Sequence, residues 1–387
     1  MMRIKKQSFW ILMVIFLVVG ALIGFMIANL TYANGGGSVR ISRSEYNDLK
    51  YMKDKYAKLE SIWNETDSSF YKEVNDKKLE SSMYKGLIAG LGDPYSEYMT
   101  KNEYDNWIAS TTGSYSGVGI TFAKDKNGNM VVVGITKGSP ASKAGIKAGD
   151  HILSVDSRKY SDSNKMAMAI RGDKGTEVKI RFSRGSRKYS RTLVRQEITN
   201  KTVSTRQLPH KLGYIRITGF EEATADDFEK ALKKCESKND RGLIIDLRDN
   251  GGGLVNSAVD IADDLLGKGV VTYMEDQNGN RKYYKSDSSK IDLPYVLLVN
   301  GHTASASEIL TAAVMDDSNN KVVGTRTYGK GIVQDTKQLE DGSALKLTVM
   351  QYFSPKGRVI HKKGIKPDYV IKKPAEQLKK AESILVD

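Results

Sequence analysis

The sequence predicts a multidomain α+β protein with a helical N-terminal part followed by mixed strands and helices. Three observations support this prediction. An uncharged apolar run covers residues 9–28, short β-rich segments separated by turn residues dominate residues 117–195, and strand-like runs alternate with helix-like runs after that. A chain of 387 residues is also too long for one typical domain.

The composition excludes several classes of protein. Hydrophobic residues make up 40% of the chain and charged residues 27%, which is normal for a folded protein with a core. The net charge is +14, but no run of five like charges occurs and the aromatic residues do not alternate with Arg, so we expect no nucleic-acid binding. The lone Cys235 cannot form an intrachain disulfide. We expect no metal and no cofactor, because the chain has no Cys pair and its histidines are far apart: His151, His210, His302 and His361.

Residues 1–35 are predicted to form a membrane anchor and a linker. The apolar run over residues 9–28 would span about 30 Å as a helix, which is the thickness of the hydrocarbon core of a bilayer. Three basic residues precede this run, so the N-terminus should stay in the cytoplasm and the rest of the chain should lie outside it, at the cell membrane. Ala33 would be the cleavage point of a signal peptide, but the run is long for one, which favours an uncleaved anchor.

Residues 38–103 are predicted to be helical. Apolar residues recur at spacings of three and four along a charged helix, at Leu49, Met52, Tyr56, Leu59 and Trp63. This stripe fits packing against its own domain and fits equally a homodimer in which the N-terminal helices of two protomers touch. A second helical stretch ends at the sequence GDP, which is typical of a helix stop followed by a turn.

The sequence patterns of residues 104–196 and of residues 197–360 differ. The first range contains the β-rich runs MVVVGI and EVKIRF, the hairpin turn KNGN and one helix-like run, SNKMAMAI. The second contains GLIIDL and YVLLVN, continuous apolar runs typical of buried strands, each followed by a helix-like run. We therefore expect a small β-rich domain with one helix, then an α/β core, and a C-terminal extension over residues 361–387 that packs on this core.

The segment GTRTYGKG, residues 324–331, nearly matches a phosphate-binding loop. Gly331 stands where that loop needs a hydroxyl to hold Mg²⁺. The following residues, GIVQDTKQL, have the pattern of a strand, so no helix N-terminus would face a phosphate. We therefore do not expect this segment to bind a nucleotide.

Ser305 lies at a predicted turn between a strand that ends at Asn300 and a helix. The residues around it are small, and the N-terminus of the new helix would direct N–H groups at a developing oxyanion, which suits a nucleophile. A simpler interpretation makes Thr303, Ser305 and Ser307 helix caps, with Glu308 closing a capping box to Ser305. Taken alone, the turn favours this simpler interpretation.

A serine nucleophile also needs a base. His302 is a poor base because it belongs to the same turn and no obvious carboxylate orients it. A lysine can serve when burial keeps its amine neutral, and Lys330 lies in an apolar, glycine-rich context. Gly329 and Gly331 would let a neighbouring helix approach this lysine closely.

Two further features complete this set. Gln334 is four residues after Lys330 and shares a face with it, so its amide could orient the amine without adding charge. The three glycines at residues 251–253 follow a buried strand, where their N–H groups could line an oxyanion hole or merely form an ordinary strand-to-helix turn.

The motifs DLRDNGGGL, TASASEI and YGKGIVQ, in this order, resemble those of the C-terminal processing (tail-specific) serine peptidases. The resemblance runs from about residue 75 to about residue 370 and includes GLGDPYSEYM, GSPASKAGIKAGD, IRGDKGTEV and SPKGRVIHKKGIKPD. It implies a crotonase-like core in which Ser305 is the nucleophile, Lys330 the general base and Gln334 the residue that orients the lysine. The oxyanion hole would be formed by the N–H of Ala306 and that of Gly251 or Gly252. His302 occupies a variable position of the family pattern.

The middle segment resembles a PDZ domain of the permuted bacterial kind. Such a domain binds a C-terminal carboxylate through backbone N–H groups of one loop and adds the peptide to an exposed strand edge. The matching loop residues are Gly117, Val118, Gly119 and Ile120. Met166 with Ala169 or Ile170 would then set a preference for apolar tails. The alternative is a groove that only packs on its host domain.

Arg171 follows the predicted helix of this domain, at a position where the family often has an arginine. The hypothesis is that Arg171 links groove occupancy to the peptidase by contacting its active-site region. The alternative is a solvated arginine.

These features together predict a membrane-anchored serine endopeptidase that recognises protein C-termini and cleaves through an acyl-enzyme. The alternative is a non-proteolytic PDZ scaffold or chaperone at the outer face of the membrane. The presence of Ser305, Lys330 and Gln334 together disfavours that alternative. A binder of polymers or lipid surfaces, acting through the charge of +14, is the other rival.

Overall fold

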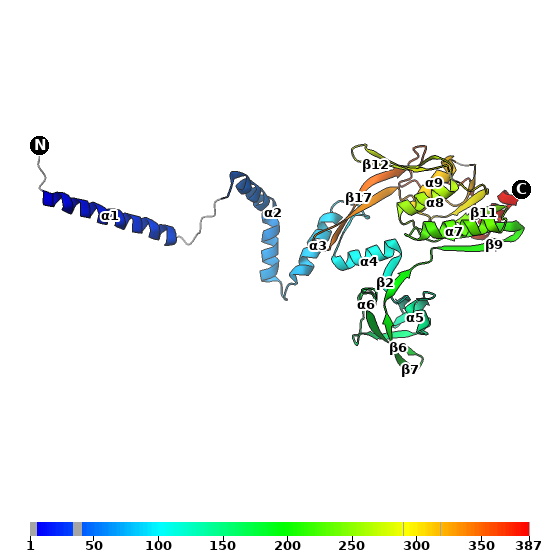
Figure 1. The fold of residues 1–387 in the computed structure, drawn as a ribbon, viewed down its shortest axis with the longest axis horizontal. Coiled ribbons are helices and arrows are strands. Elements are labelled where there is room, and N and C mark those ends of the chain that lie inside the picture. The colour runs from blue at the N-terminus through cyan, green and yellow to red at the C-terminus, as the bar shows by residue number, and fades with distance from the viewer. Residues whose placement is uncertain (1–5, 34–40, 289, 318, 387) are drawn as a thin grey trace. The chain divides into compact units, whose positions relative to one another are not determined.

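The computed structural model describes residues 6–33, 41–288, 290–317 and 319–386. The chain divides into two compact units, residues 1–79 and residues 80–387. Figure 1 shows a helical N-terminal part followed by mixed helices and strands, which confirms the predicted α+β multidomain fold.

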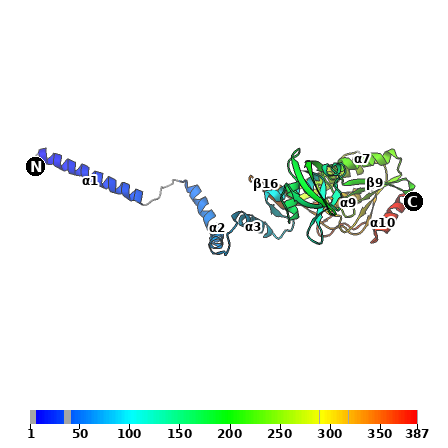
Figure 2. The ribbon, with the colours of Figure 1, turned by 90° about the horizontal axis from the view of Figure 1, so that it is seen from below.

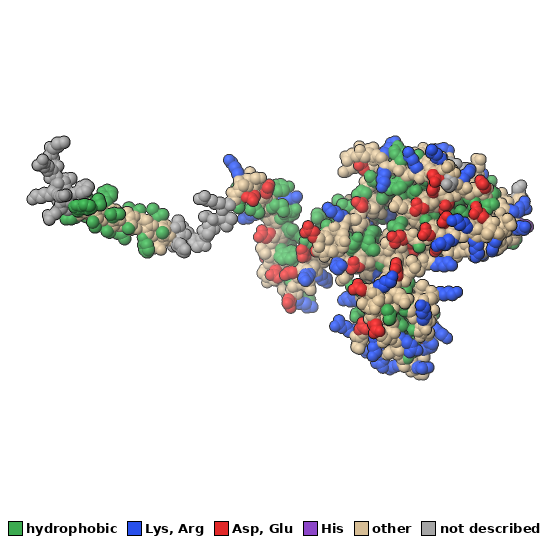
Figure 3. Space-filling view, in the orientation of Figure 1, with side chains coloured by type: hydrophobic (Ala, Val, Ile, Leu, Met, Phe, Trp, Pro, Cys, Tyr) green, Lys and Arg blue, Asp and Glu red, His purple; other side chains and the backbone are tan. Residues whose placement is uncertain are grey.

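The first unit contains α1 (Lys6–Ala33) and α2 (Arg43–Ser69). Within α1, the stretch Trp10–Asn29 is long and apolar enough to cross a membrane. The side chains of this stretch are exposed in the isolated chain, and Figure 3 shows them as an apolar surface. A helix of this kind, near the N-terminus, occurs in membrane anchors and in signal sequences.

Helix α2 begins with a capping box. The N–H of Glu45 donates to the hydroxyl of Ser42 at 3.1 Å, and the carboxylate of Glu45 accepts from the N–H of Ser42 at 2.7 Å. The predicted apolar stripe lies on this helix, yet no described residue of α2 is buried and Leu49 is 61% exposed. The stripe therefore has no cover within this unit, and contact with a second protomer stays a prediction.

A six-stranded sheet forms the centre of the second unit. Its order is β18-β15-β14-β11-β10-β9, and every neighbouring pair is parallel except β9 with β10. The strands are β9 (Val203–Leu208), β10 (Leu212–Ile217), β11 (Gly242–Asp246), β14 (Tyr295–Val299), β15 (Lys321–Gly324) and β18 (Tyr369–Val370). The 3₁₀-helix η1 (Pro209–Lys211) joins β9 to β10.

Helices cover both faces of this sheet. Leu243 and Ile245 pack with the helices of one face, whereas Ile244 packs with Ala381 on the other, as expected where successive side chains of a strand point to opposite faces. In Figure 2, α7 and α10 lie on opposite sides of β9. The helices are α7 (Thr224–Ser237), α8 (Val255–Leu265) and α9 (Ala306–Asp317) on one face and α10 (Pro374–Val386) on the other.

A second, antiparallel sheet contains five strands, in the order β1-β17-β12-β13 with β16 also paired to β17. These strands are β1 (Glu97–Met99), β12 (Gly269–Asp276), β13 (Arg281–Ser286), β16 (Ile332–Gln338) and β17 (Ala344–Phe353). The strand predicted after Lys330 is thus confirmed as β16.

The structure differs from the prediction near the boundary expected between residues 103 and 104. Helix α3 (Asp76–Ala89) leads to β1, which pairs with β17 although it comes from the range predicted to be helical. A strand of three residues is too short to show a periodic pattern, so the sequence could not reveal it. Helix α4 (Lys101–Thr112) crosses the predicted boundary.

The β-rich domain is entered through β2 (Ser114–Gly117) and left through β8 (Gln196–Thr199), which pair with each other. Its sheet has the order β3-β4-β5-β6-β7, so β3 is an edge strand. Residues 116–193 contain 16 Lys and Arg but only 6 Asp and Glu, so this small domain holds most of the chain's excess of positive charge. Figure 3 shows basic side chains over its surface, around β6 and β7. The elements are β3 (Ile120–Lys124), β4 (Met130–Ile135), α5 (Pro140–Lys143), β5 (His151–Val155), α6 (Ser163–Ile170), β6 (Glu177–Arg184) and β7 (Arg187–Val194).

Candidate active site

Ser305 lies between β14 and α9 in a strained backbone conformation. Its φ is 56°, in the left-handed region that residues with a side chain rarely adopt. Such strain is often found where a turn presents a functional side chain. No other described residue makes a hydrogen bond with the Ser305 hydroxyl, so only half of the capping box in the simpler interpretation forms: the N–H of Ser305 donates to the carboxylate of Glu308 at 3.0 Å.

The neighbouring hydroxyls have structural roles instead. The hydroxyl of Thr303 donates to the carbonyl oxygen of Leu247 at 2.8 Å, and that of Ser307 donates to the carbonyl oxygen of Asn250 at 3.0 Å. These bonds hold the serine turn against the loop that follows β11.

Gly252 of that loop approaches Ser305 closely. Its φ is 99°, and a Cβ atom at this position would lie 2.8 Å from the Cβ atom of Ser305 and 2.9 Å from the nitrogen of Ala306. A side chain at residue 252 would therefore collide with the serine turn, which explains the need for glycine here. The N–H of Gly252 already donates to the side chain of Asn250 at 2.9 Å. The N–H of Gly251 has no acceptor among the residues that the structure describes.

The buried carboxylate of Glu308 connects the serine turn to the lysine loop. One of its oxygens accepts from the N–H groups of Ser305 at 3.0 Å and Lys330 at 2.9 Å. The other accepts from the hydroxyl of Thr327 at 2.5 Å and from the N–H of Gly329 at 2.8 Å. Burial raises the pKa of Glu308, and these four hydrogen bonds oppose that rise because they favour the charged form.

Tyr352 forms a second connection between the two segments. Its buried hydroxyl lies 3.0 Å from the carbonyl oxygen of Ser305 and also contacts the carbonyl oxygen of Lys330. Burial holds the pKa of this phenol well above its ordinary value. Nothing local in the sequence indicates that Tyr352 or Glu308 reaches the lysine loop, so Tyr352 was not predicted and Glu308 was expected only in a helix cap.

Lys330 is half-buried, and its backbone but not its amine is joined to the serine turn. Nζ of Lys330 lies 4.6 Å from the centre of the Tyr95 ring. Within the described ranges it makes no hydrogen bond with Ser305 or Gln334. Burial lowers the pKa of the Lys330 ammonium, Lys346 lowers it further, and Asp93 opposes both.

The glycines beside Lys330 pack differently from the expectation. A Cβ atom at Gly331 would collide with the backbone of His361, and one at Gly329 would lie 2.9 Å from the nitrogen of Gly364. They allow close approach of the turn at residues 360–364, whereas we expected them to fit against a helix. This turn contacts the lysine loop but lies about 30 residues further along the chain, so no local sequence pattern predicts the contact.

Gln334 lies on β16, beside a bulge in its pairing with β17. Its amide nitrogen donates to the hydroxyl of Thr348 at 3.1 Å. In this structure the amide is therefore directed at β17, and its predicted role in orienting Lys330 stays a prediction.

His302 has a carboxylate partner, contrary to the expectation. Its Nδ1 lies 3.1 Å from an oxygen of Asp249, which also accepts from the side-chain amide of Asn300 at 2.8 Å. Hydrogen bonds from Asn300 and then from His302 lower the pKa of Asp249. The imidazole is 81% exposed, however, and no described contact joins it to Ser305.

The predicted peptide groove corresponds to a cleft of about 390 Å³ between β3 and α6. Four of the predicted groove residues line it: Val118, Gly119, Ile120 and Ile170. Arg171, which was predicted to have a regulatory role, lines it as well. Gly117 instead pairs with β8, and Met166 is 1% exposed within the core of the domain. The groove face of α6 carries Asn164 and Ala167, and a rotation of about 100° per residue turns Met166 away from it. The assignment of Met166 to the groove was therefore wrong.

Arg171 contacts α4 rather than Ser305 or Lys330. One guanidinium nitrogen donates to the side chain of Asn106, and the guanidinium lies 5.0 Å from the centre of the Tyr115 ring. On α4, the neighbouring Trp107 has Nζ of Lys346 5.7 Å from its ring centre. After burial, the charge of Lys346 is the next cause of the lowered pKa of Lys330. Contacts that begin at Arg171 therefore reach, through neighbouring residues of α4, a charge that acts on the lysine.

The described residues contain no group of three or more His, Cys, Asp or Glu side chains placed to hold a metal ion.

The fold and the serine turn define the class of this protein as a serine peptidase with an attached PDZ domain. Residues 211–371 match the description "Peptidase family S41", residues 116–193 match "PDZ domain", and residues 17–103 match "Activating protease CtpB N-terminal domain".

Known proteins resemble the chain over most of its length. The carboxy-terminal processing protease CtpA of Bacillus subtilis is 38% identical over 81% of this chain and 68% of its own length. A CtpA-like serine protease of Staphylococcus saprophyticus is 32% identical over 96% of this chain and 75% of its own. The structure of a photosystem II D1 C-terminal processing protease is 29% identical, with a TM-score of 0.50 over 81% of this chain and 86% of that one. The chain therefore belongs to the S41 family of C-terminal processing serine peptidases.

Proposed function

We propose that the chain is a membrane-anchored endopeptidase in which Ser305 and Lys330 form the catalytic dyad. The observation that supports this most strongly is the pair of hydrogen bonds from the N–H groups of Ser305 and Lys330 to one carboxylate oxygen of buried Glu308. This contact holds the two backbones together while leaving the serine hydroxyl without a partner among the described residues. The burial of Lys330 also lowers the pKa of its amine, as a general base requires.

The reaction would proceed through an acyl-enzyme. Neutral Lys330 accepts the proton of the Ser305 hydroxyl, the serine oxygen attacks the peptide carbonyl carbon, and the protonated lysine then gives its proton to the leaving amine. Water hydrolyses the ester in a second step, again with Lys330 as the base. For the first step Nζ of Lys330 must turn away from the Tyr95 ring and towards Ser305, where Gln334 would orient it.

The oxyanion that forms during the attack would be stabilised by backbone N–H groups. The N–H of Ala306 is at the start of α9, where the helix dipole favours a negative charge. The N–H of Gly251 is the second donor favoured by the structure, since that of Gly252 is already bonded to Asn250. Gly252 would then serve to bring the loop close to Ser305.

The PDZ domain would select substrates by their C-termini. The N–H groups of Val118, Gly119 and Ile120 stand at the start of β3, and β3 is an edge strand to which an extended peptide can be added. Gly117 remains part of the approach to this loop, through its pairing in β2. Ile170 with Ala167 would favour an apolar last residue in the bound tail.

The helix α1 would anchor the enzyme, with the N-terminus in the cytoplasm and the peptidase outside. Cells expressing the full chain would be treated with an added protease before and after permeabilisation. Degradation of the peptidase in cells whose cytoplasm is still closed supports this orientation, and protection of the peptidase there contradicts it.

The catalytic assignment is tested with the full chain in detergent micelles. Mass spectrometry would follow cleavage of an unfolded protein and the labelling of serine by a fluorophosphonate. We expect both to disappear in Ser305→Ala and cleavage to disappear in Lys330→Ala, whereas His302→Ala keeps cleavage. Equal cleavage by the wild type and both dyad variants would overturn the proposal, and tail binding without any cleavage would leave the scaffold interpretation.

A further inference from the structure

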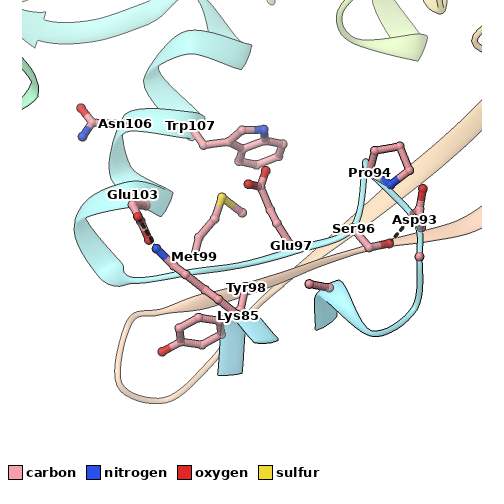
Figure 4. A pocket seen from close by; sticks show the side chains of 12 residues that line it. Lys85, Asp93, Pro94, Ser96, Glu97, Tyr98, Met99, Glu103, Asn106 and Trp107 are labelled. Carbon is pink, nitrogen blue, oxygen red and sulfur yellow. Dashed lines mark hydrogen bonds and ion pairs between the residues drawn. The ribbon is translucent and has the colours of Figure 1, made fainter. Parts of the chain in front are cut away.

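The turn formed by residues 93–96, between α3 and β1, is held by the side chain of Asp93. Its carboxylate accepts from the hydroxyl of Ser96 at 2.6 Å and from the N–H of Tyr95 at 3.2 Å. Figure 4 shows the contact between Asp93 and Ser96 at one end of a cleft of about 770 Å³ that β1 and α4 also line. Because both bonds close the same short loop, they define the direction in which Tyr95 leaves the backbone.

This turn is placed against the peptidase by β17. The strand that follows it, β1, pairs with residues 344–346 of β17, and the N–H of Thr348 donates to the hydroxyl of Ser96 at 3.0 Å. Thr348 is also the residue that accepts the bond from Gln334. The turn at residues 93–96 is therefore connected through one residue to the side chain predicted to orient the catalytic lysine.

Tyr95 extends from this turn to Lys330. Nζ of Lys330 lies 4.6 Å from the centre of the Tyr95 ring, well inside the range of a cation–π interaction. The negative face of an aromatic ring attracts an ammonium ion and has little attraction for a neutral amine. The contact therefore favours the protonated form of the lysine, the form that cannot accept a proton from serine.

We infer that Tyr95 is a positioning residue for Lys330: its ring holds the ammonium form of the resting enzyme away from Ser305. This inference rests on the proposed role of Lys330 as the general base. The amine must lose its proton and leave the ring before it can serve Ser305, so the ring raises the pH at which the enzyme becomes active.

Other charged and titratable groups surround Lys330 and act on the same equilibrium. Asp93 favours the ammonium form and Lys346 opposes it. The remaining groups are Tyr328 in the same loop, Glu308 on α9, Tyr352 on β17 and His361 beside Gly331. The Tyr95 hydroxyl also shares a hydrogen bond with Tyr328, so Tyr95→Phe removes that bond alone, whereas Tyr95→Leu removes it together with the aromatic face. The comparison of the two variants therefore isolates the effect of the aromatic face.

The test compares Tyr95→Leu with Tyr95→Phe in the full chain in detergent. The activity, kcat/KM for a fluorogenic peptide, is measured from pH 5 to pH 11. Leucine removes the aromatic face, so we expect the acid limb of the profile to move to lower pH by about half a unit to one and a half units. Phenylalanine keeps the face and loses only the hydroxyl, so its midpoint should stay near that of the wild type.

Tyr98→Leu is the matched control, since Tyr98 also lies in this segment but packs on Tyr84, 5.1 Å between ring centres. It should leave the midpoint unchanged even if it lowers the overall rate. A structural role for Tyr95 would lower the rate at every pH without moving the midpoint. An unmoved midpoint in Tyr95→Leu, or equal movement in all three variants, would overturn the inference.

A second measurement separates this inference from the proposed function. Acetic anhydride acylates only the neutral amine, so the extent of labelling of Lys330 against pH, read by mass spectrometry after digestion, reports its pKa directly. If Lys330→Ala keeps activity, the proposed base is wrong, yet a lower labelling midpoint in Tyr95→Leu still supports the contact with Tyr95. If Lys330→Ala is inactive and the labelling midpoint does not move, the dyad stands and the inference about Tyr95 fails.

Discussion

Replacement of Glu308 by glutamine should weaken the hydrogen-bonded connection between the serine turn and the lysine loop. The carboxylate accepts four hydrogen bonds through two oxygens, whereas a glutamine amide has one oxygen and one NH₂ group. If the NH₂ group faces the N–H groups of Ser305 and Lys330, two bonds are lost. If it faces Thr327 and Gly329, one bond is lost, because the Thr327 hydroxyl can accept as well as donate. At about 1.5 kcal/mol for each bond to a charged acceptor, the loss is about 1.5 to 3 kcal/mol. We use the lower end of the range because the variant also relieves the burial of a charge.

Hydrogen exchange measured by mass spectrometry would report this loss locally, at the amides of Ser305, Gly329 and Lys330. A loss of about 1.5 to 3 kcal/mol corresponds to exchange roughly 10- to 100-fold faster in peptides that cover these residues. Since a small displacement of either proposed catalytic group is costly, kcat/KM should also fall by about 10- to 100-fold.

Glu103→Gln is the matched control. Glu103 is likewise the third residue of its helix and accepts from the N–H and hydroxyl of Thr100, but its side chain is 48% exposed. Its replacement should cost less than about 1 kcal/mol and leave kcat/KM unchanged. Wild-type exchange rates in Glu308→Gln, together with kcat/KM within threefold of the wild type, would refute the claim that Glu308 holds the serine turn and the lysine loop together.

Three further predictions follow from contacts outside the proposed dyad. Lys346→Gln removes a positive charge that lowers the pKa of Lys330, so the acid limb of kcat/KM should move to higher pH; movement to lower pH would contradict the assigned sign. Arg171→Ala removes the contact with Asn106 and should reduce stimulation of cleavage by an added C-terminal peptide, measured as the ratio of rates with and without it; unchanged basal and stimulated rates would disprove the hypothesis for Arg171. Asp150, held by Arg184 and the hydroxyl of Tyr189, has its pKa lowered from 3.8 to about 2, so it stabilises the PDZ domain above about pH 4, and this stability should be lost as the pH falls towards 2. Thermal melts should show a smaller acid-induced decrease in melting temperature for Asp150→Asn than for the wild type. Equal decreases would argue against this contribution of Asp150 to stability.

The sequence predicted the parts of the site that depend on local pattern. The continuous apolar runs gave β11 and β14, and the small residues after β14 pointed to a turn at Ser305. The structure adds a φ of 56° at that residue, which no local pattern reveals. It also showed that Met166 faces the core, because a helix of eight residues offers too few apolar positions to tell a groove face from a buried face.

Contacts between distant segments were beyond the sequence. Asp249 reaches His302 across 53 residues, and the turn that carries Tyr95 reaches β17 across about 250. Neither contact has a local signature, since a carboxylate or a tyrosine in a turn is common on any surface. The GDPYS segment was noted only as a helix stop and as part of a family pattern, although its side chains reach the lysine.

The chemistry of Lys330 is therefore shared between segments that a division into domains would separate. The match to the peptidase family begins at residue 211, yet Asp93 and Tyr95 lie more than 100 residues before it. Both influences of this early segment favour the ammonium form, whereas burial and Lys346 on β17 favour the neutral amine. Because β1 pairs with β17 next to Lys346, a displacement of this strand would change both sets of influences at once. Helix α4, which follows β1 directly, receives the contact from Arg171, so a PDZ domain that moved α4 would act on the pKa of the proposed base, Lys330.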